Sequence, residues 1–262
     1  MPVLDAPRTS FNGSLTAARS FATVALPFDE VRRIRAQHEG VTINDVVLAV
    51  VSGALRRWLA AHDEHPTQSL TAGVPVGADR QGAAPRLGGN RVSNMFTTLA
   101  TDIDDPVDRL LQISRTSSQA KQIQQHIGLE LMSDWGQFIP PSVFPGLVRA
   151  YSRVSAASWH PAAFNVIVSN VPGPREPVTI GGARLRDMFS VGPLADGIGL
   201  NVTVWSYVST LNFSLLACTD LLPDVHVLAS YFPDALAELD DEPTPADVTA
   251  EATDVDASGA SA

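Results

Sequence analysis

The spacing of apolar residues and the residues that start or stop helices predict α-helices in three segments of the first half of the chain. The clearest covers residues 43–58, and Thr42 and Asp45 stand at its start as a near-match to a capping box. A shorter pattern covers residues 29–40 and stops at a glycine, the residue type that most often ends helices. Residues 105–125 open with an acid followed by proline, the usual order at a helix start. We expect one helix in each segment.

Other segments read as strands. Residues 199–206 and 211–217 alternate apolar and polar side chains on either side of a short turn, which predicts an antiparallel hairpin. Residues 166–168 form an unbroken apolar run, which predicts a strand buried on both faces. Three more strands are expected at 21–26, 70–76 and 92–100, and a last helix at 223–239.

Residues 127–157 carry Trp135, Phe138 and Phe144 among several prolines. We interpret them as short core helices joined by proline kinks. The alternative is an amphipathic surface that admits lipid chains or rests on a membrane.

Composition indicates one globular domain. The chain has 262 residues, of which 45% are hydrophobic and 18% charged. Its single cysteine, Cys218, ends an apolar run far from any histidine, so we interpret it as buried filler in a reducing compartment. No apolar run approaches the roughly 20 residues that span a bilayer. We therefore expect a cytoplasmic protein, peripheral at most to membranes or lipid droplets.

Acidic charge is concentrated at the end of the chain. The net charge is −10, and residues 240–262 hold seven acidic residues and no basic one, which predicts a disordered tail. The nearly neutral remainder argues against a nucleic-acid partner. His62 and His65 flank two acids, but no third group of ligands supports a metal site.

The most specific text lies between residues 164 and 207. In SNVPGP, Pro172 and Pro174 cannot donate backbone hydrogen bonds, so the preceding strand must end in a rigid turn. VGPLADGIGLN follows, with glycines around Asp196 that let the backbone approach a ligand or a strand closely. These motifs, together with INDVVLAVVSGALRRWL upstream, resemble the C-terminal half of the bacterial wax ester synthase/diacylglycerol acyltransferases (WS/DGAT). The resemblance covers roughly residues 8–239.

The resemblance implies an α/β fold, a mixed-sheet sandwich similar to one lobe of chloramphenicol acetyltransferase and condensation domains. Whole enzymes of the family have two such lobes, with the active site in a channel between them. Residues 1–15 resemble the linker between the lobes, residues 16–239 would form the C-terminal lobe, and residues 240–262 the tail. The family's catalytic motif, HHxxxDG, belongs to the N-terminal lobe, and none of the six histidines here begins even HxxxD.

What this half could supply is the opposite wall of the channel. The candidate residues are Asn44, Asp45, Ser169, Asn170, Asp196, Gly197 and Asn201. The sequence leaves other roles open for three of them: Asp45 as a helix cap, Asp196 as part of an Asp-Gly turn, and Asn201 as a buried residue that fixes two strands. We expect no catalytic residue, metal or cofactor in this chain, apart from acyl-CoA as a cosubstrate.

Two functions follow from the resemblance. The first is the C-terminal lobe of an acyl-CoA-dependent O-acyltransferase that makes triacylglycerol from diacylglycerol, or wax ester from a long-chain alcohol. It would be inactive until an N-terminal lobe with HHxxxDG joins it. The second is a non-catalytic binding or assembly module, because an apolar face without its partner lobe favours pairing with a second copy or a full-length relative. A gene product without function is a third possibility.

Overall fold

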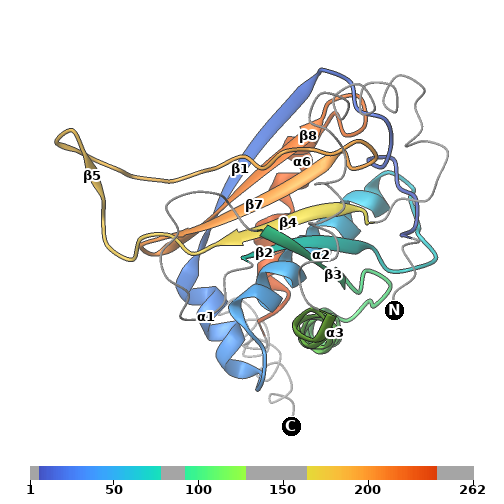
Figure 1. The fold of residues 1–262 in the computed structure, drawn as a ribbon, viewed down its shortest axis with the longest axis horizontal. Coiled ribbons are helices and arrows are strands. Elements are labelled where there is room, and N and C mark those ends of the chain that lie inside the picture. Colours follow the sequence, from blue (N-terminus) through green and yellow to red (C-terminus); the bar gives the residue numbers. More distant parts are fainter. Residues whose placement is uncertain (1–5, 78–91, 128–163, 241–262) are drawn as a thin grey trace, which may run out of the picture.

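A six-stranded mixed sheet forms the centre of the computed structural model, which describes residues 6–77, 92–127 and 164–240 (Figure 1). The strand order is β1-β8-β7-β4-β2-β3. Strand β4 is parallel to both β2 and β7, and the other neighbours are antiparallel. The strands are β1 (Arg19–Pro27), β2 (Thr71–Gly77), β3 (Val92–Thr98), β4 (Val166–Val171), β7 (Leu200–Tyr207) and β8 (Thr210–Cys218).

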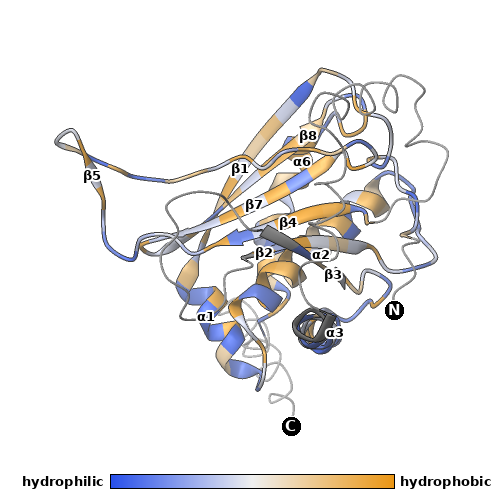
Figure 2. Cartoon of the chain, in the orientation of Figure 1, coloured by the Kyte–Doolittle hydropathy of each residue, from blue (hydrophilic) through white to orange (hydrophobic). Residues whose placement is uncertain are grey.

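Helix α2 (Ile43–Ala61) is the element around which the helical layer packs. It contacts β4 of the sheet and each of the other helices of the described residues. Apolar residues are frequent in the sheet and along α2, whereas α1 is largely polar (Figure 2). The predicted α/β fold with a mixed sheet is therefore confirmed. The other helices are α1 (Phe28–Gln37), α3 (Pro106–Ile127), α6 (Val225–Ser230) and α7 (Phe232–Ala237).

The predicted hairpin is confirmed, since β7 and β8 pair antiparallel along their whole length. The strand at 166–168 is also present, but it is not buried on both faces. Val166 and Val168 are buried, whereas Ile167 is half-buried. Successive side chains of a strand point to opposite faces, so only the face toward the helices is fully covered here.

The last helix differs from the prediction. In place of one helix over 223–239, α6 and α7 meet at Tyr231. Pro233 has no N–H to donate to the carbonyl of Ala229, and its ring would clash with that carbonyl in a continuous helix. Helix α7 therefore starts anew, with Pro233 in its first turn, where the helix needs no donor from it.

A two-stranded arm that the sequence analysis did not predict projects from the body (Figure 1). It consists of β5 (Thr179–Ile180) and β6 (Ala183–Arg184), joined by Gly181 and Gly182. Both glycines have positive φ, 57° and 84°, the backbone that the type I′ hairpin turn needs at both central positions.

A buried ion pair joins three helices. Arg109 on α3 is 2% exposed and donates to Glu238 at 2.5 Å, just after α7. It also donates to the carbonyls of Ile103 and Asp104, at 3.1 Å each. Burial lowers the pKa of Arg109, and the charge of Glu238 opposes that effect. Because Glu238 also pairs with Arg57 of α2 at 2.8 Å, one carboxylate ties α2 and α3 to the end of α7.

The segment predicted to resemble a linker packs into the body over the residues that the structure describes. Phe11 is fully buried and meets Trp58 of α2 edge to face, with ring centroids 5.9 Å apart. The boundary at residue 15 and the start of the tail at 240 stay predictions. Trp135, Phe138 and Phe144 lie outside the described residues, as does the tail from 241.

Candidate functional site

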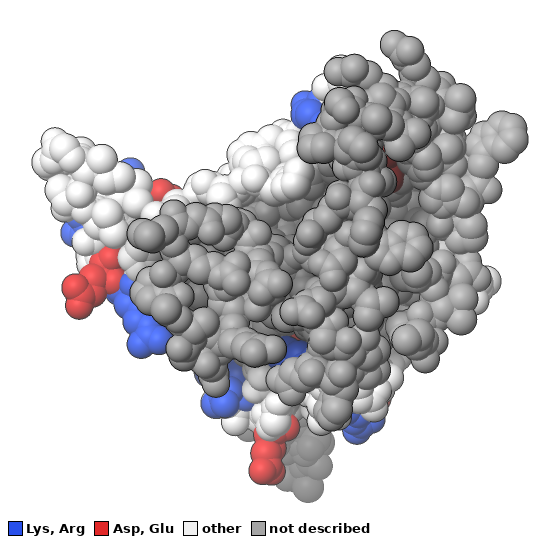
Figure 3. All heavy atoms as spheres, in the orientation of Figure 1, with Lys and Arg blue, Asp and Glu red and all other residues white. Residues whose placement is uncertain are grey.

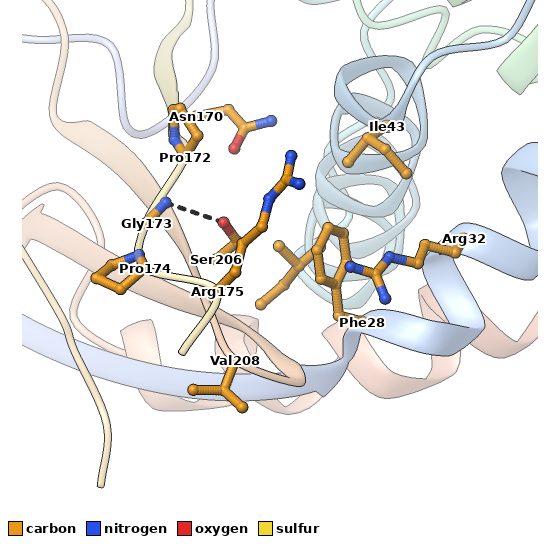
Figure 4. A pocket seen from close by; sticks show the side chains of 11 residues that line it. Phe28, Arg32, Ile43, Asn170, Pro172, Gly173, Pro174, Arg175, Ser206 and Val208 are labelled. Atoms are coloured by element: carbon orange, nitrogen blue, oxygen red, sulfur yellow. Dashed lines mark hydrogen bonds between the residues drawn. The ribbon is translucent and has the colours of Figure 1, made fainter. Parts of the chain in front are cut away.

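A hollow of about 370 Å³ lies where the carboxyl ends of β4 and β7 approach the first turns of α1 and α2 (Figure 4). Parallel pairing of β4 with β7 brings these two strand ends together. The hollow combines apolar surface with two guanidinium groups, an amide and a hydroxyl. It is lined by Phe28, Arg32, Ile43, Asn170, Pro172, Gly173, Pro174, Arg175, Ser206, Val208 and Leu211.

The SNVPGP turn forms one side of the hollow and is held tightly against β7. Gly173 donates its N–H to Ser206 Oγ at 3.0 Å, and Pro174 accepts from the N–H of Val208 at 3.0 Å. A Cβ on Gly173 would lie 2.0 Å from the carbonyl oxygen of Ser206, so only glycine fits there. Val208 itself has φ of 52°, a strained conformation for a β-branched residue. The turn is thus fixed in place beside a strained hairpin.

Ser169 and Asn170 are consecutive on β4 and therefore face opposite sides of the sheet. Asn170 lies on the side of the helices and lines the hollow. Ser169 pairs in register with Thr203 on the opposite side. Within the described part of the chain, the side-chain amide of Asn170 has no hydrogen-bond partner. It is therefore available to a ligand in the hollow.

Asp45 caps α2. It is 1% exposed, its Oδ2 accepts from the N–H and the hydroxyl of Thr42, at 2.9 and 2.7 Å, and the Thr42 hydroxyl accepts from the N–H of Asp45. The predicted capping box is complete. Asn44 is half-buried, and neither residue lines the hollow, although their neighbour Ile43 does. A role for Asn44 and Asp45 as a channel wall stays a prediction.

Asp196 and Gly197 lie at the other end of β7, away from the hollow. Asp196 Oδ1 accepts from the N–H of Leu15 at 2.9 Å, and Gly197, with φ of 90°, donates to the carbonyl of Gly13 at 3.0 Å. Asn12 bridges the carbonyls of Gly197 and Asn165, at 3.0 and 3.1 Å. The contacts of this loop fasten the N-terminal segment to the sheet.

Asn201 fastens a loop to the outer face of the sheet. Its amide donates to the carbonyl of Pro193 at 3.0 Å, and its Oδ1 accepts from the hydroxyl of Thr203 at 2.9 Å. Trp205 and Asn212 hold the same loop, through Ser190 Oγ and the carbonyl of Met188. Both ends of the Asn201 amide are thus engaged within the chain, and it joins a strand to a loop.

The seven predicted residues therefore do not form one site: they lie at the start of α2, in the hollow, on the opposite face of the sheet and in the loop before β7. Only Asn170 lines the hollow itself. The sequence analysis missed Phe28, Arg32, Arg175 and Ser206. Arg175 offered a signal, since it is the basic residue that directly follows SNVPGP.

Among the described residues, the side chains that line the hollow include no histidine or carboxylate that could act as a base. His62 stacks on Trp58 at 4.0 Å and pairs with Asp224 at 2.9 Å, at the far end of α2. Cys218 is fully buried, as predicted. Burial raises the pKa of its thiol, but hydrogen bonds with Thr16 and with nearby backbone lower that pKa by a larger amount, so the net shift is downward. No group of metal ligands occurs among the described residues, and none of the described helices could cross a membrane.

Comparison with known families matches two parts of the chain to the same family. Residues 88–240 match the WS/DGAT C-terminal domain, and residues 1–47 match the wax ester synthase/diacylglycerol acyltransferase catalytic domain. Two Mycobacterium tuberculosis H37Rv proteins, each named for diacylglycerol O-acyltransferase activity, are both 40% identical to this chain, over 242 and 220 residues. These matches cover 91% and 84% of this chain but 47% and 45% of the relatives. The chain thus spans about half the length of the relatives it matches.

Solved structures agree. The wax ester synthase/diacylglycerol acyltransferase from Marinobacter aquaeolei VT8 superposes with a TM-score of 0.70 and 32% identity, over 89% of this chain and 51% of that one. The starter condensation domain of rhizomide synthetase superposes with a TM-score of 0.54 and 13% identity, over 93% of this chain and 50% of that one, which shows a shared fold alone. The chain belongs to the wax ester synthase/diacylglycerol acyltransferase family.

Proposed function

We propose that this chain forms one wall of the substrate channel of an acyl-CoA-dependent O-acyltransferase. The observation that carries the proposal is the hollow itself. The start of α2 and the SNVPGP turn, two family motifs far apart in sequence, border the same space. Asn170 reaches that space with an amide that has no other partner among the described residues.

The reaction needs a base that this wall does not provide. The hydroxyl oxygen of diacylglycerol or a long-chain alcohol bonds to the thioester carbonyl carbon, and the carbon–sulfur bond then breaks. A base takes the hydroxyl proton, which finally reaches the departing CoA sulfur. The base would be a histidine of the HHxxxDG lobe, whether that lobe is joined to this chain or separate. This chain would bind and orient substrate.

Reconstitution tests the proposal. The purified 262-residue chain is incubated with radiolabelled palmitoyl-CoA and either diolein or hexadecanol. The assay is then repeated with the N-terminal half of the Marinobacter enzyme, added as a separate chain or fused to this one. We expect neutral lipid only when that lobe is present, and none when the second histidine of its HHxxxDG is replaced by alanine.

Two results would contradict the proposal. Neutral lipid from the chain alone would show that it contains a base of its own. Absence of product from both the mixture and the fusion, with both parts folded by circular dichroism, would show that this chain does not complete the channel.

A further inference from the structure

Two arginines face the hollow from different elements. Arg32 belongs to α1, and Arg175 directly follows the SNVPGP turn. In Figure 4 their side chains enter from opposite sides, with Arg175 reaching toward the start of α2. Basic side chains lie on the surface around α1 and at the base of the β5–β6 arm, beside acidic ones (Figure 3). Two cationic groups that converge on one hollow create a favourable place for an anion.

Neither arginine forms a strong ion pair with another described residue. Within the described residues Arg175 has no hydrogen bond or ion pair, and the adjacent Glu176 is exposed. Arg32 lies over the Phe28 ring at 4.1 Å and pairs with Asp29 at 3.0 Å. The Asp29 side chain is 80% exposed, and ion pairs in such surroundings contribute little stability. A multiply charged ligand can therefore replace Asp29 as the partner of Arg32.

The neighbouring groups suit a phosphate ester better than a free metal or an apolar chain. Ser206 Oγ accepts from the N–H of Gly173, which leaves its own hydrogen free to donate. Asn170 adds amide donors, and guanidinium groups bind phosphate oxygens through paired hydrogen bonds. Ile43 and Leu211 provide apolar surface beside these donors for the organic part of a ligand.

We infer that this hollow binds the phosphate groups of the acyl-CoA cosubstrate, through Arg32 and Arg175. This inference rests on the proposed function, because it takes acyl-CoA as the cosubstrate. It also gives the turn a role: the Gly173 backbone, held against β7, keeps Arg175 beside the hollow. The thioester would then extend from this anchor toward the partner lobe.

Binding to the isolated chain tests the inference without any acyl transfer. Isothermal titration calorimetry compares CoA, 3′-dephospho-CoA and pantetheine, which carry successively fewer phosphate groups. We expect affinity to fall in that order. Arg32→Gln and Arg175→Gln should each weaken CoA binding about tenfold, the loss typical of one charge-assisted contact. Arg115→Gln, at an exposed position on α3, is the matched control and should bind like the wild type.

Three results would overturn the inference. These are absence of CoA binding, CoA binding that is the same in both arginine variants as in the wild type, and affinity for CoA that does not depend on its phosphate groups.

A second experiment uses phosphatidylglycerol vesicles, since a phospholipid headgroup also carries a phosphate ester. Vesicle binding that needs both arginines, without CoA binding, would assign the hollow to lipid. A chain that binds CoA through both arginines but gives no product with the partner lobe would overturn the proposed function alone.

Discussion

Gly173 is the single residue on which the shape of the hollow depends most directly. Its Cα approaches β7 so closely that a Cβ would lie 2.0 Å from the carbonyl oxygen of Ser206. We expect Gly173→Ala to lower the free energy of unfolding by about 2–3 kcal/mol, because backbone must shift to relieve the clash. Urea denaturation measures this loss, and CoA titration should show weaker binding as Arg175 moves.

Gly181→Ala is the matched comparison. Gly181 has φ of 57°, but a Cβ there would meet nothing within 4 Å. The cost should be that of the backbone conformation alone, about 1 kcal/mol. Equal losses in the two variants would mean that close approach at Gly173 is not what fixes the turn.

Glu238 should matter for stability far more than an ordinary surface carboxylate. Glu238→Gln would leave the Arg109 guanidinium buried at 2% exposure with only carbonyl partners. Removing one partner of a fully buried pair costs about 3–5 kcal/mol. Because the Glu238 side chain is 25% exposed, we expect about 2 kcal/mol in urea denaturation. Glu39→Gln, at an exposed position on the loop before α2, should change stability by less than about 0.5 kcal/mol.

For single residues, the sequence indicated which ones have a particular role more reliably than it indicated which groups they contact. Asn201 stood out as a polar residue in one of the family motifs, and it is buried with both amide atoms engaged. Its partner, however, is the carbonyl of Pro193 in a loop. No period or motif reveals such a contact, since it depends on how the chain between β6 and β7 returns across the sheet.

At the scale of elements, variants at the cap of α2 distinguish two roles for Asp45: capping the helix and forming part of the channel wall. Thr42→Ala and Asp45→Ala each remove side-chain bonds of the capping box, and each should lower the free energy of unfolding by about 1–2 kcal/mol. If Asp45 acts only as a cap, the two variants should lose acyl transfer equally in the reconstituted enzyme. A much larger loss of transfer for Asp45→Ala, at equal stability, would show that its carboxylate also serves the channel.

Most elements were predictable because each has a local signature. The capping box of α2, the acid and proline at the start of α3 and the alternation in β7 and β8 are all signals within a few residues. Pro233 carried an equally local signal, yet the apolar stripe through 225–239 favoured one continuous helix. The helix is interrupted at Pro233 because a missing N–H donor and a steric clash outweigh a favourable pattern of burial.

At the scale of the whole molecule, local sequence patterns predicted most helices and strands but not which of them lie next to one another around the hollow. The hollow unites the start of α1, the start of α2 and the ends of β4 and β7. Their adjacency follows from the sheet order, in which β4 lies between β2 and β7. Resemblance to a family supplied the fold class, and the two motifs at the hollow came with it. Arg32 has no motif around it, so only the folded chain could place it beside Arg175.

The N-terminal segment has the sequence of a linker, but its described residues, 6–15, pack against the core. Deleting it tests whether it belongs to the domain. Phe11 is fully buried against Trp58, and Asn12 bridges β7's entry loop and the residue before β4. We expect deletion of residues 1–15 to lower the thermal midpoint by about 10 °C or more, the shift expected from losing one large buried side chain. Phe11→Ala measures the same contribution if the deleted chain does not fold. Deletion of 241–262, which is acidic and poor in apolar residues, should leave the midpoint unchanged. If the first deletion were equally harmless, residues 6–15 would be a dispensable linker, and the C-terminal lobe would begin at β1.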